Sequence, residues 1–384
     1  MRRIKIFQIG LVWFPEQGGG LDRFYYDLIR RLPENGFDVR GLVVGSDQVD
    51  IQTEGAIKSA TDTSTPLLKK LISIYHFSRA TFRSFAPDLL VSHFALHAFP
   101  ILSLIGRRPL VVHFHGPWAL EASVEGSKIY WVKIAKFIEK AVYSRAKRII
   151  VLSKAFRKIL HEEYNIPLDK IVIIPGAIET RKFTKNAISV SRDQARNELG
   201  WSLERPTILI VRRLANRMGL EDAIIAIENV RVRFPNVLLL IAGKGHLHSE
   251  LSQIIIDRAL ENNVKLLGFI PDDKLALNYR AANFTLVPTI SLEGFGLITV
   301  ESLASGTPVL VTPVGGLPEV VEDLSADLVL PATGPDAIAD GLTKILSGEQ
   351  ALPDEETCME YADKNFSWVV ASSRIAKIYR EALE

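Results

Sequence analysis

Two glutamates in the second half of the chain flank a short glycine-rich stretch that has the composition of a ligand site. Glu293 comes just before this stretch and Glu301 follows it, with seven residues between them. The stretch contains Gly294, Phe295, Gly296 and Leu297. Glycines let a backbone approach a ligand closely, and the free N–H groups at the start of a helix near Gly296 and Leu297 would bind an anion. At about 1.5 Å per residue, Glu301 would lie on the order of 8 Å along that helix. A diphosphate there would have a carboxylate on either side, one suited to a sugar hydroxyl and the other to a ribose diol.

A strand and a helix would position these residues. Residues 284–288 are apolar and predict a buried strand, and residues 297–304 carry apolar side chains at helical spacing. An ordinary strand-to-helix turn with two solvated glutamates would show the same pattern. Glu293 favours a ligand site, because an acidic residue just before an anion-binding turn is electrostatically unfavourable unless a polyhydroxyl ligand needs an acceptor there.

Arginines gather at a second predicted strand end. The apolar run 208–211 predicts a strand, and Arg212, Arg213 and Arg217 follow it, ahead of a helical pattern. Guanidinium groups beside a helix start are suited to a diphosphate, because they can bind it through two parallel hydrogen bonds.

A histidine follows a predicted strand in the first half. The strand at 110–114 leads into His115 and Gly116, which would place an imidazole at the carboxyl end of a sheet. It could hydrogen-bond a sugar hydroxyl or a developing charge there, although a structural role is the alternative. His113 alternates with Phe114 along the strand, so it is expected to face the opposite side of the strand and to be buried.

Together these motifs resemble the nucleotide-binding signature of the retaining glycosyltransferases of family 4, which have the GT-B fold. The two glutamates around Gly-Phe-Gly are the most specific part of a resemblance that covers essentially the whole chain. The arginine loop resembles the family's Gly-Arg-Leu…Lys-Gly motif with two departures. Arg212 stands where a glycine is usual, and Met218 stands where the phosphate-binding lysine is usual. Arg213 matches the motif directly, and Arg217 is the hypothesised source of the missing charge.

The resemblance implies a role for each residue. Glu293 would position the donor sugar, and Glu301 would hold the ribose. His115 would face the sugar, and Arg213 would stabilise the leaving diphosphate. Further donor-binding positions are expected at Gly18, Gly19, Gly20, Arg217, Gly243, Lys244, Phe269, Ile270, Gly294, Phe295, Gly296 and Leu297. The turn at 312–319 would support the site.

The expected fold class is α/β, with two Rossmann-like domains facing across a cleft. Apolar strand-like runs alternate with helical ones throughout, which predicts βα units and parallel sheets. The predicted strands lie at 4–9, 39–44, 89–92, 110–114, 149–152 and 171–174, and then at 208–211, 238–242, 264–267, 284–287, 309–311 and 328–330. We expect an N-terminal acceptor-side domain at 1–180 and a nucleotide-sugar-binding domain at 190–366. By resemblance, a helix at 368–384 would cross back to the first domain.

Charge is unevenly distributed along the chain. The net charge of the 384 residues is only +2, but residues 1–180 carry 25 Lys+Arg against 17 Asp+Glu, and residues 181–384 carry 21 against 27. Basic amphipathic helices with aromatic residues are predicted at 66–85 and 128–148, a pattern typical of membrane-surface contact. Core-facing apolar stripes with solvated lysines are the alternative. An acidic membrane surface is an expected partner, and nucleic acid is not, because no nucleic-acid motif accompanies the charge.

No metal ion or other cofactor is expected. The chain has no Asp-x-Asp sequence with which to bridge a divalent ion to phosphates, so protein cations would take that role. The single cysteine, Cys358, excludes an internal disulfide framework, and no apolar stretch reaches the ~18 residues of a membrane-spanning helix. A cytoplasmic location is expected, with contact to the inner face of the membrane.

Two other functions remain open from the sequence. A nucleotide-sugar epimerase on the same fold would also bind a donor at Glu301 and Arg213. A noncatalytic subunit that keeps the fold is favoured only by Met218. We therefore expect a retaining, metal-independent glycosyltransferase that moves a sugar from a nucleotide diphosphate, with UDP as the expected nucleotide. Its acceptor would be a hydroxyl of a glycan or lipid-linked molecule in cell-surface polysaccharide synthesis.

Overall fold

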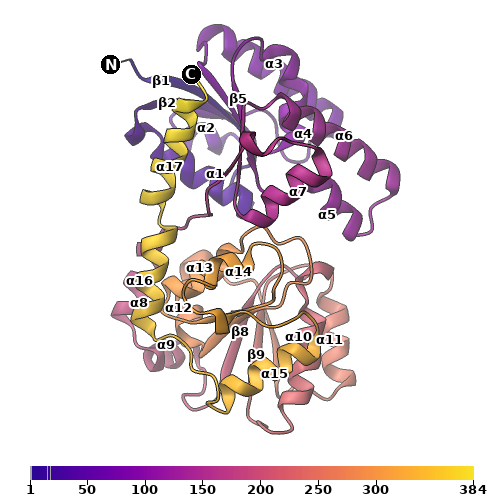
Figure 1. The fold of residues 1–384 in the computed structure, drawn as a ribbon, viewed down its shortest axis with the longest axis vertical. Coiled ribbons are helices and arrows are strands. Elements are labelled where there is room, and N and C mark those ends of the chain that lie inside the picture. Colours follow the sequence, from indigo (N-terminus) through magenta and orange to yellow (C-terminus); the bar gives the residue numbers. More distant parts are fainter. Residues whose placement is uncertain (1, 15, 18) are drawn as a thin grey trace. The chain divides into compact units, whose positions relative to one another are not determined.

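The computed structural model describes residues 2–14, 16–17 and 19–384, and the chain divides into two compact units (Figure 1). Unit 1 comprises Met1–Gly176 and Trp368–Glu384, and unit 2 comprises Ala177–Ser367. The last helix of the chain, α17 (Trp368–Glu381), therefore belongs to the unit in which the chain begins.

Unit 1 is built on a seven-stranded parallel sheet with the order β3-β2-β1-β4-β5-β6-β7. Its strands are β1 (Ile4–Val12), β2 (Phe37–Val44), β3 (Ile57–Ser59), β4 (Leu89–Ser92), β5 (Leu110–Phe114), β6 (Arg148–Val151) and β7 (Ile171–Ile173). Every residue of β4 and β5 is buried, as the central strands of a sheet covered on both faces must be.

The helices of unit 1 cover both faces of this sheet. They are α1 (Gly20–Arg31), α2 (Gln48–Gln52), α3 (Leu67–Ser84), α4 (Ala95–Ala98), α5 (Trp118–Val124), α6 (Ile129–Arg145), α7 (Lys154–Tyr164) and α17, with short 3-10 turns η1 (Pro33–Asn35), η2 (Phe99–Leu104) and η3 (Leu168–Lys170). Helices α3, α4, α6 and α7 share one apolar core with the sheet. Helices α1 and α17 pack against each other outside that core.

Unit 2 is built on a five-stranded parallel sheet with the order β10-β9-β8-β11-β12. Its strands are β8 (Thr207–Val211), β9 (Leu238–Ala242), β10 (Val264–Gly268), β11 (Phe284–Val287) and β12 (Val309–Val311). Its helices are α8 (Thr180–Ser189), α9 (Arg192–Leu199), α10 (Leu220–Val230), α11 (His248–Asp257), α12 (Asp272–Ala281), α13 (Leu297–Ala304), α14 (Leu317–Val321), α15 (Pro335–Leu346) and α16 (Glu355–Phe366), with η4 (Asn216–Met218) and η5 (Ala326–Leu328).

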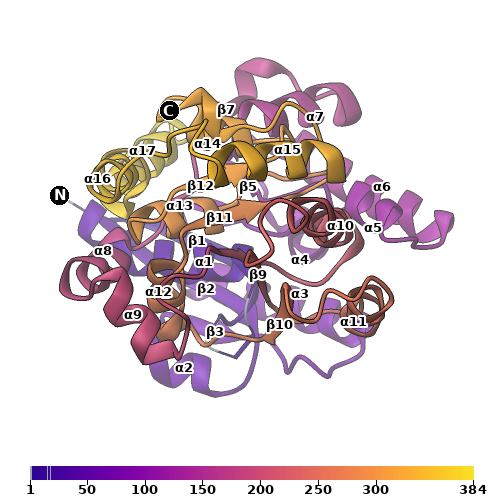
Figure 2. The same ribbon diagram turned by 90° about the horizontal axis from the view of Figure 1, so that it is seen from below.

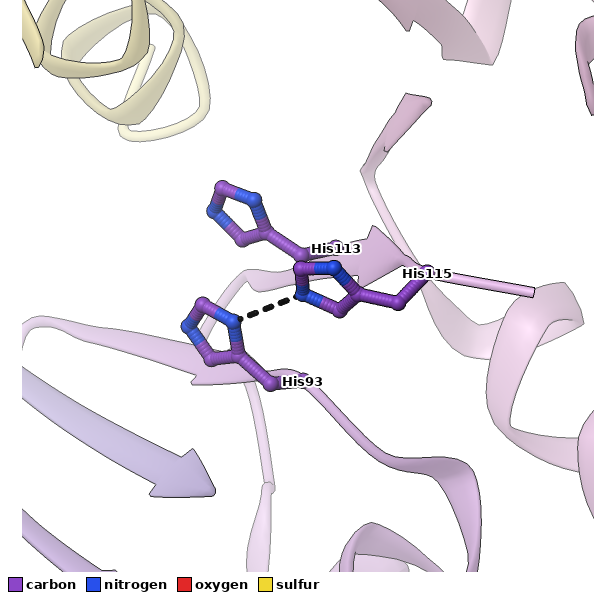
Figure 3. A group of neighbouring side chains, drawn as sticks. All are labelled: His93, His113 and His115. Carbon is purple, nitrogen blue, oxygen red and sulfur yellow. Dashed lines mark hydrogen bonds between the residues drawn. The ribbon is translucent and has the colours of Figure 1, made fainter. Parts of the chain in front are cut away.

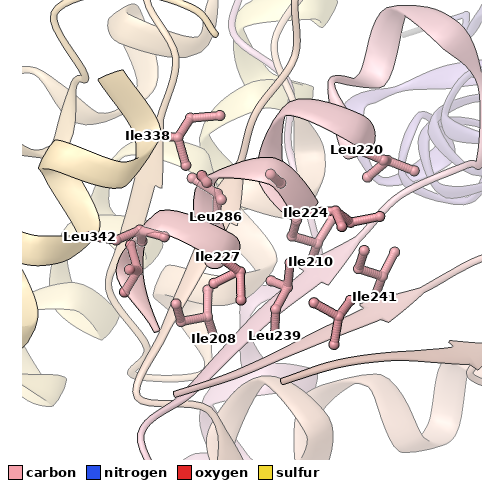
Figure 4. Close-up of a cluster of buried hydrophobic side chains, with 14 of the residues drawn as sticks. Ile208, Ile210, Leu220, Ile224, Ile227, Leu239, Ile241, Leu286, Ile338 and Leu342 are labelled. Atoms are coloured by element: carbon pink, nitrogen blue, oxygen red, sulfur yellow. The ribbon is translucent and has the colours of Figure 1, made fainter. Parts of the chain in front are cut away.

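One apolar core of unit 2 lies between the sheet and α10, α11 and α15 (Figure 4). Figure 2 shows these three helices on one side of the strands, with α8, α9 and α12 on the other. Ile208, Ile210 and Ile241 of the strands meet Ile224 and Ile227 of α10 with almost no exposed surface. This packing fixes the strand ends from which the loops of the candidate site depart.

Two strand predictions were wrong. Residues 328–330 were expected to form a strand, but η5 occupies Ala326–Leu328 and only an isolated bridge joins Val329 to Val311 of β12. The short edge strand β3 was not predicted, because Lys58 and Ser59 interrupt the apolar pattern at that position. In place of the expected six strands in each half, the described residues form a sheet of seven strands in unit 1 and one of five in unit 2. No helix among the described residues is both long and apolar enough to cross a membrane.

Candidate active site

The site in unit 2 forms where the strand order of the sheet reverses. From the neighbouring strands β8 and β11, the chain continues outward to β9 on one side and to β12 on the other. Such a point in an open parallel sheet leaves room for a ligand at the carboxyl ends of the strands. The loops after β8 and β11 lie side by side here. The Ile290 N–H donates to the Arg217 carbonyl at 3.0 Å, and Arg217 Nη1 donates to the Leu292 carbonyl at 2.9 Å.

A buried ion pair also links these two loops. Arg212 Nη2 donates to Glu293 Oε2 at 2.5 Å, and the two side chains are only 7% and 14% exposed. Burial alone would raise the pKa of Glu293. The charge and hydrogen bond of Arg212, the charge of Arg217 and the Phe295 N–H together hold that pKa below its usual value. Glu293 is therefore an ionised acceptor at neutral pH.

The Arg212 guanidinium also lies against Met218. Its Nε and Nη2 approach the Met218 Sδ at 3.1 and 2.7 Å. Met218 is buried and belongs to the apolar core described above. The guanidinium thus contacts both a carboxylate and a thioether, and its Nη2 contacts both groups.

Glycine turns fix the backbone that carries Glu293. The Gly316 N–H donates to the Glu293 carbonyl at 3.0 Å. Gly315 has φ +58°, and a Cβ there would lie 1.9 Å from the same carbonyl oxygen, so no side chain fits. Gly296, with φ +77°, is the N-cap of α13. The turn at 312–319, which was predicted to support the site, therefore contacts the backbone of Glu293 directly.

The loop after β9 lies against the arginine loop, and the loop after β10 lies against the loop after β9. The Leu214 N–H donates to the Lys244 carbonyl at 2.9 Å, and a Cβ on Gly243 would lie 1.7 Å from the Arg212 carbonyl oxygen. Lys244 Nζ lies 5.0 Å from the ring centroid of Phe269, which is 60% exposed. An exposed ring beside a cation offers a surface on which a planar ligand can stack.

The remaining predicted residues of α13 and its turn are more enclosed. Glu301 is buried and accepts a hydrogen bond from the Tyr279 hydroxyl at 3.0 Å. Phe295 is buried as well and packs edge-on against Phe366, with ring centroids 5.5 Å apart. The Phe295 side chain therefore belongs to the core, which corrects its assignment as a ligand contact except through its backbone.

The other predicted positions of unit 2 differ in exposure. Gly294 is buried, whereas Leu297 and Ile270 are half-buried. The Arg213 side chain is exposed and, within the described part of the chain, makes no ion pair. Arg217 is buried, with its guanidinium turned toward the Leu292 carbonyl. Of the two predicted cations, Arg213 is therefore the one accessible to a ligand.

Three histidines gather at the carboxyl ends of β4 and β5 in unit 1 (Figure 3). His93 follows β4, His113 lies in β5, and His115 follows β5. His93 Nδ1 and His115 Nε2 are 3.1 Å apart, and His93 Nε2 lies 2.9 Å from Gln8 Oε1 in β1. The strand order of this sheet reverses between β1 and β4, so this cluster also lies at a switch point.

The hydrogen bonds define the protonation of the cluster. The Gln8 amide oxygen can only accept, so His93 Nε2 donates to it. Burial holds the pKa of His93 well below its usual value and lowers that of His115 to about 3, so both rings are neutral. A neutral His93 must accept at Nδ1, and His115 therefore donates from Nε2. This leaves the Nδ1 of His115 as a hydrogen-bond acceptor.

The prediction for His113 is confirmed: it is buried, and it faces the side of β5 opposite to Phe114. It lies on the same side of the strand as His115. Residues two apart in a strand share a face, and Phe114 between them points into the core against Phe156. His113 Nε2 lies 2.7 Å from the Tyr379 hydroxyl of α17.

The ring nitrogens of His93, His113 and His115 lie within 4.8 Å of one another, a spacing that is also found in metal sites. The rings of His93 and His113 are stacked at an interplanar angle of 7°, and His115 is tilted by only 21° and 15° from them. In this structure His93 is hydrogen-bonded to His115 and to Gln8. The arrangement fits hydrogen-bonded neutral imidazoles.

The glycine-rich loop before α1 is described in part. Gly18 lies outside the described residues. Gly19 is the N-cap of α1, and Gly20 is its first residue; both are exposed. Asp22 in the first turn of α1 accepts a hydrogen bond from the Val12 N–H at 3.0 Å, and burial raises the pKa of Asp22 to about 6.

Three residues of these sites were not among the predicted site residues. Arg212 was noted only as a departure from a motif, and Gln8 and His93 were not selected. His93 directly follows β4, which was predicted, so a histidine at a strand end was the available signal. No sequence pattern marks Gln8, whose role depends on a contact with a residue 85 positions away.

Solved structures with the same fold identify the architecture. Sucrose-phosphate synthase from Thermosynechococcus elongatus aligns with a TM-score of 0.81 at 20% identity over 99% of both chains. HepE of Anabaena, solved in complex with UDP-glucose, aligns with a TM-score of 0.77 at 20% identity over 98% of this chain and 100% of its own. The fold is the GT-B fold of glycosyltransferases.

Family models assign the chain more narrowly. The model described as glycosyl transferases group 1 matches residues 191–365, and the model described as glycosyltransferase family 4 matches residues 18–182. An uncharacterised glycosyltransferase of Methanocaldococcus jannaschii is 28% identical over 239 residues, or 62% of this chain. The match spans 60% of the length of that curated relative. The chain belongs to the group 1 glycosyltransferases of family 4, and the resemblance found in its motifs is confirmed.

Proposed function

We propose that this protein is a retaining glycosyltransferase that moves a sugar from a UDP-sugar to a hydroxyl of a glycan or lipid-linked acceptor in cell-surface polysaccharide synthesis. The observation that carries the proposal is the buried pair of Arg212 and Glu293 at the switch point of unit 2, beside the first turn of α13. It places a cation and an ionised hydroxyl acceptor where a diphosphate and a sugar would lie together.

The donor would be bound in three parts. The diphosphate would meet the exposed Arg213 and the N–H groups at the start of α13. The sugar hydroxyls would be held by Glu293, and the ribose by Glu301, whose carboxylate is oriented by Tyr279. The base would stack on Phe269, next to Lys244. UDP is the expected nucleotide, and the fold neighbour solved with UDP-glucose supports this choice.

The chemistry would rely on charge stabilisation of the leaving group. Cleavage of the bond to the diphosphate leaves negative charge on the phosphate oxygens and positive charge on the sugar ring. The arginines and the α13 N–H groups would stabilise the negative charge on the phosphate oxygens without a metal ion. No side chain is assigned as a covalent nucleophile, so we favour displacement on the same face, with the departing phosphate accepting the proton of the attacking hydroxyl. The neutral Nδ1 of His115 would accept a hydrogen bond from a sugar hydroxyl.

The acceptor side of the proposal rests on unit 1. Helix α6 exposes Tyr130, Ile134 and Phe137, at 49%, 44% and 66%, and these positions are three or four residues apart. They form one apolar stripe on the solvent-facing side, flanked by the exposed Lys133 and Lys140.

The start of α3 likewise exposes Leu67, Leu68 and Ile72. Both helices pack against η2. Apolar and aromatic groups among lysines suit an anionic lipid surface.

Vesicle cosedimentation tests this membrane contact. We expect binding to vesicles that contain phosphatidylglycerol, weaker binding to phosphatidylcholine alone, and loss of binding at high salt. Lys133→Glu with Lys140→Glu should reduce binding, whereas Lys377→Glu on α17 is the matched control. Binding that ignores both salt and the charge reversal would contradict the membrane proposal.

A ligand screen followed by a transfer assay tests the proposed activity. UDP, GDP, ADP and their common sugar conjugates are compared by thermal unfolding, because a ligand at about 100 times its Kd adds roughly 2.7 kcal/mol of stability. Stabilisation by UDP and transfer with retained configuration support the proposal. Epimerisation without an acceptor would favour the epimerase, and tight binding without turnover on any acceptor would favour a noncatalytic subunit.

A further inference from the structure

The two positions at which the arginine loop departs from the family motif are in contact with each other. Arg212 replaces the usual glycine and Met218 the usual lysine, and the Arg212 guanidinium lies 2.7–3.1 Å from the Met218 Sδ. The two residues are six positions apart, on either side of the turn that leads into α10. One departure adds a cation and the other removes one at the same place.

The contact explains why both departures occur together. A lysine at position 218 would put its ammonium group beside the Arg212 guanidinium in a buried setting, where two like charges repel strongly. A methionine carries no charge, and its flexible thioether can pack against the guanidinium. Conversely, a glycine at position 212 beside Met218 would remove the ion-pair partner of Glu293 and the largest of the contributions that lower its pKa.

We propose that Arg212, and not Arg217, is the cation that takes the place of the missing lysine and binds the donor diphosphate. This inference rests on the proposed function, because it assumes a diphosphate donor. Arg217 donates from Nη1 to the Leu292 carbonyl, and its part is to position the loop that carries Glu293.

Arg212 can bind a phosphate without giving up Glu293. Its Nη2 is bonded to Glu293, and its Nε and Nη2 contact Met218. Within the described residues its Nη1 has no hydrogen-bond partner. The guanidinium is planar and presents five N–H donors, so it can bridge the carboxylate to a phosphate oxygen.

A second observation places a polar group at the same helix start. The hydroxyl of Thr299, in the first turn of α13, is fully buried and has no hydrogen-bond partner among the described residues. It lies 3.1 Å from where a Cβ on Gly296 would be, so it is close to the N-cap of the helix. A phosphate oxygen bound at this turn would give that hydroxyl an acceptor.

A reciprocal swap tests the proposal. Arg212→Gly, Met218→Lys and the double variant are compared with the wild type, with UDP, GDP and ADP as calorimetric probes. Arg212→Gly should weaken binding of the preferred nucleotide by about tenfold to a hundredfold, because a charge-assisted hydrogen bond is lost. Met218→Lys alone should also weaken nucleotide binding, because the new ammonium group would repel the Arg212 guanidinium beside it. The double variant, which restores the family pattern, should return to within about threefold of the wild type.

Controls separate this inference from loss of folding and from failure of the proposed function. Arg231→Gly, whose guanidinium binds the Ala259 carbonyl, removes an arginine elsewhere in unit 2 and should leave nucleotide binding unchanged. Thermal unfolding of each variant reports its fold, and Arg212→Lys should retain part of the affinity if Arg212→Gly unfolds. Wild-type affinity in Arg212→Gly, or a double variant as weak as the sum of the singles, overturns the inference. No nucleotide binding by the wild type would instead overturn the proposed function.

Discussion

The two sheets place different chemistry at equivalent points. In unit 1 the switch point between β1 and β4 holds Gln8, His93 and His115, which are neutral and joined by hydrogen bonds. In unit 2 the switch point between β8 and β11 holds Arg212 and Glu293, which are fully charged. Both sites are largely buried. Burial alone therefore does not decide whether a group is charged; the available partners do.

Each arrangement suits a different part of a glycosyl donor or acceptor. A neutral imidazole with a defined acceptor nitrogen can orient an uncharged hydroxyl without attracting ions. In an arginine–carboxylate pair, the arginine can bind a diphosphate while the carboxylate accepts a hydrogen bond from a hydroxyl. The comparison predicts that changes in unit 2 act mainly through charge, whereas changes in unit 1 act mainly through hydrogen-bond direction.

The largest expected effect is that of Glu293→Gln. It keeps the shape of the side chain but removes the charge that compensates the buried Arg212, and turnover should fall by at least about a hundredfold. The free energy of unfolding should fall by up to about 3–5 kcal/mol, the cost of breaking a buried ion pair. Steady-state kinetics and urea unfolding measure both effects.

Glu228→Gln is the matched control for that variant. Its carboxylate pairs with Arg258 at 2.5 Å on the surface, where both side chains are about a third exposed. An exposed pair contributes about 0–1 kcal/mol, so neither stability nor turnover should change appreciably. If Glu293→Gln behaved like Glu228→Gln, the assignment of a functional charge pair would be wrong.

A smaller effect is expected for Glu301→Ala. The loss of a ribose acceptor should weaken UDP binding by about tenfold, with a smaller change in turnover. The Tyr279 hydroxyl would also lose its buried acceptor, at a cost of about 1–3 kcal/mol. Glu301→Gln keeps an acceptor for Tyr279 and should recover most of the stability. Equal, near-neutral effects of changes at Glu301 and Glu293 would refute the site assignment.

As the pH falls, the histidine cluster and the Arg212–Glu293 pair should begin to lose stability at different pH values. The folded-state pKa values of His93, His113 and His115 are lowered by burial, so the unfolded chain binds more protons below about pH 6.5. Each histidine should then cost up to about 1.4 kcal/mol per pH unit as the pH falls from about 6.5. Glu293, whose folded-state pKa is also lowered, contributes stability that is lost only below about pH 4.5.

Urea unfolding of the wild type and of His115→Gln between pH 7.5 and 5 tests this difference. The variant should show a shallower dependence, by roughly one proton, because glutamine does not titrate. An unchanged slope would mean that His115 is protonated in the folded protein. The hydrogen-bond scheme of the cluster would then be wrong.

The smallest expected effect is that of Gln8→Leu. Without the amide oxygen, nothing keeps the proton on His93 Nε2, and His115 can shift its own proton to Nδ1. Turnover should fall only about threefold to tenfold, within the range of a lost hydrogen bond. The nitrogen chemical shifts of His115 in NMR spectra should report a mixed tautomer, whereas Gln8→Glu should keep the tautomer of the wild type. A single, unchanged tautomer in Gln8→Leu would show that Gln8 does not position His115.

The sequence was sufficient for the features that local pattern determines. Central strands such as 110–114 and 284–287 were predicted with the observed bounds, because a short uninterrupted apolar run in an α/β chain favours a buried central strand. The strand predicted at 328–330 was wrong, since an equally apolar run can also pack as a turn beside β12. The edge strand β3 is too polar to be recognised from an apolar pattern, because a strand at the edge of a sheet has fewer neighbours and buries fewer side chains.

The candidate site could be predicted only where a residue acts through its place in a motif. Glu293 and Glu301 stand out because they flank the stretch that contains Gly294 and Gly296. The contact of Arg212 with Met218 depends on how a side chain turns back across six residues, which spacing does not encode. Phe295 lies within the motif, yet its ring packs on Phe366, 71 positions further along the chain, and no local pattern distinguishes these outcomes.

The position of α17 has a consequence for how the protein is made. The Tyr379 hydroxyl reaches Gln8 and His113, which precede it by 371 and 266 residues. During translation the first 176 residues of unit 1 therefore emerge from the ribosome without α17, which is synthesised only after all of unit 2. A nascent chain in this state exposes the surface that α17 will cover, so chaperones have a defined interval in which to act on it. Completion of the histidine cluster is thus among the last events in the biogenesis of the protein.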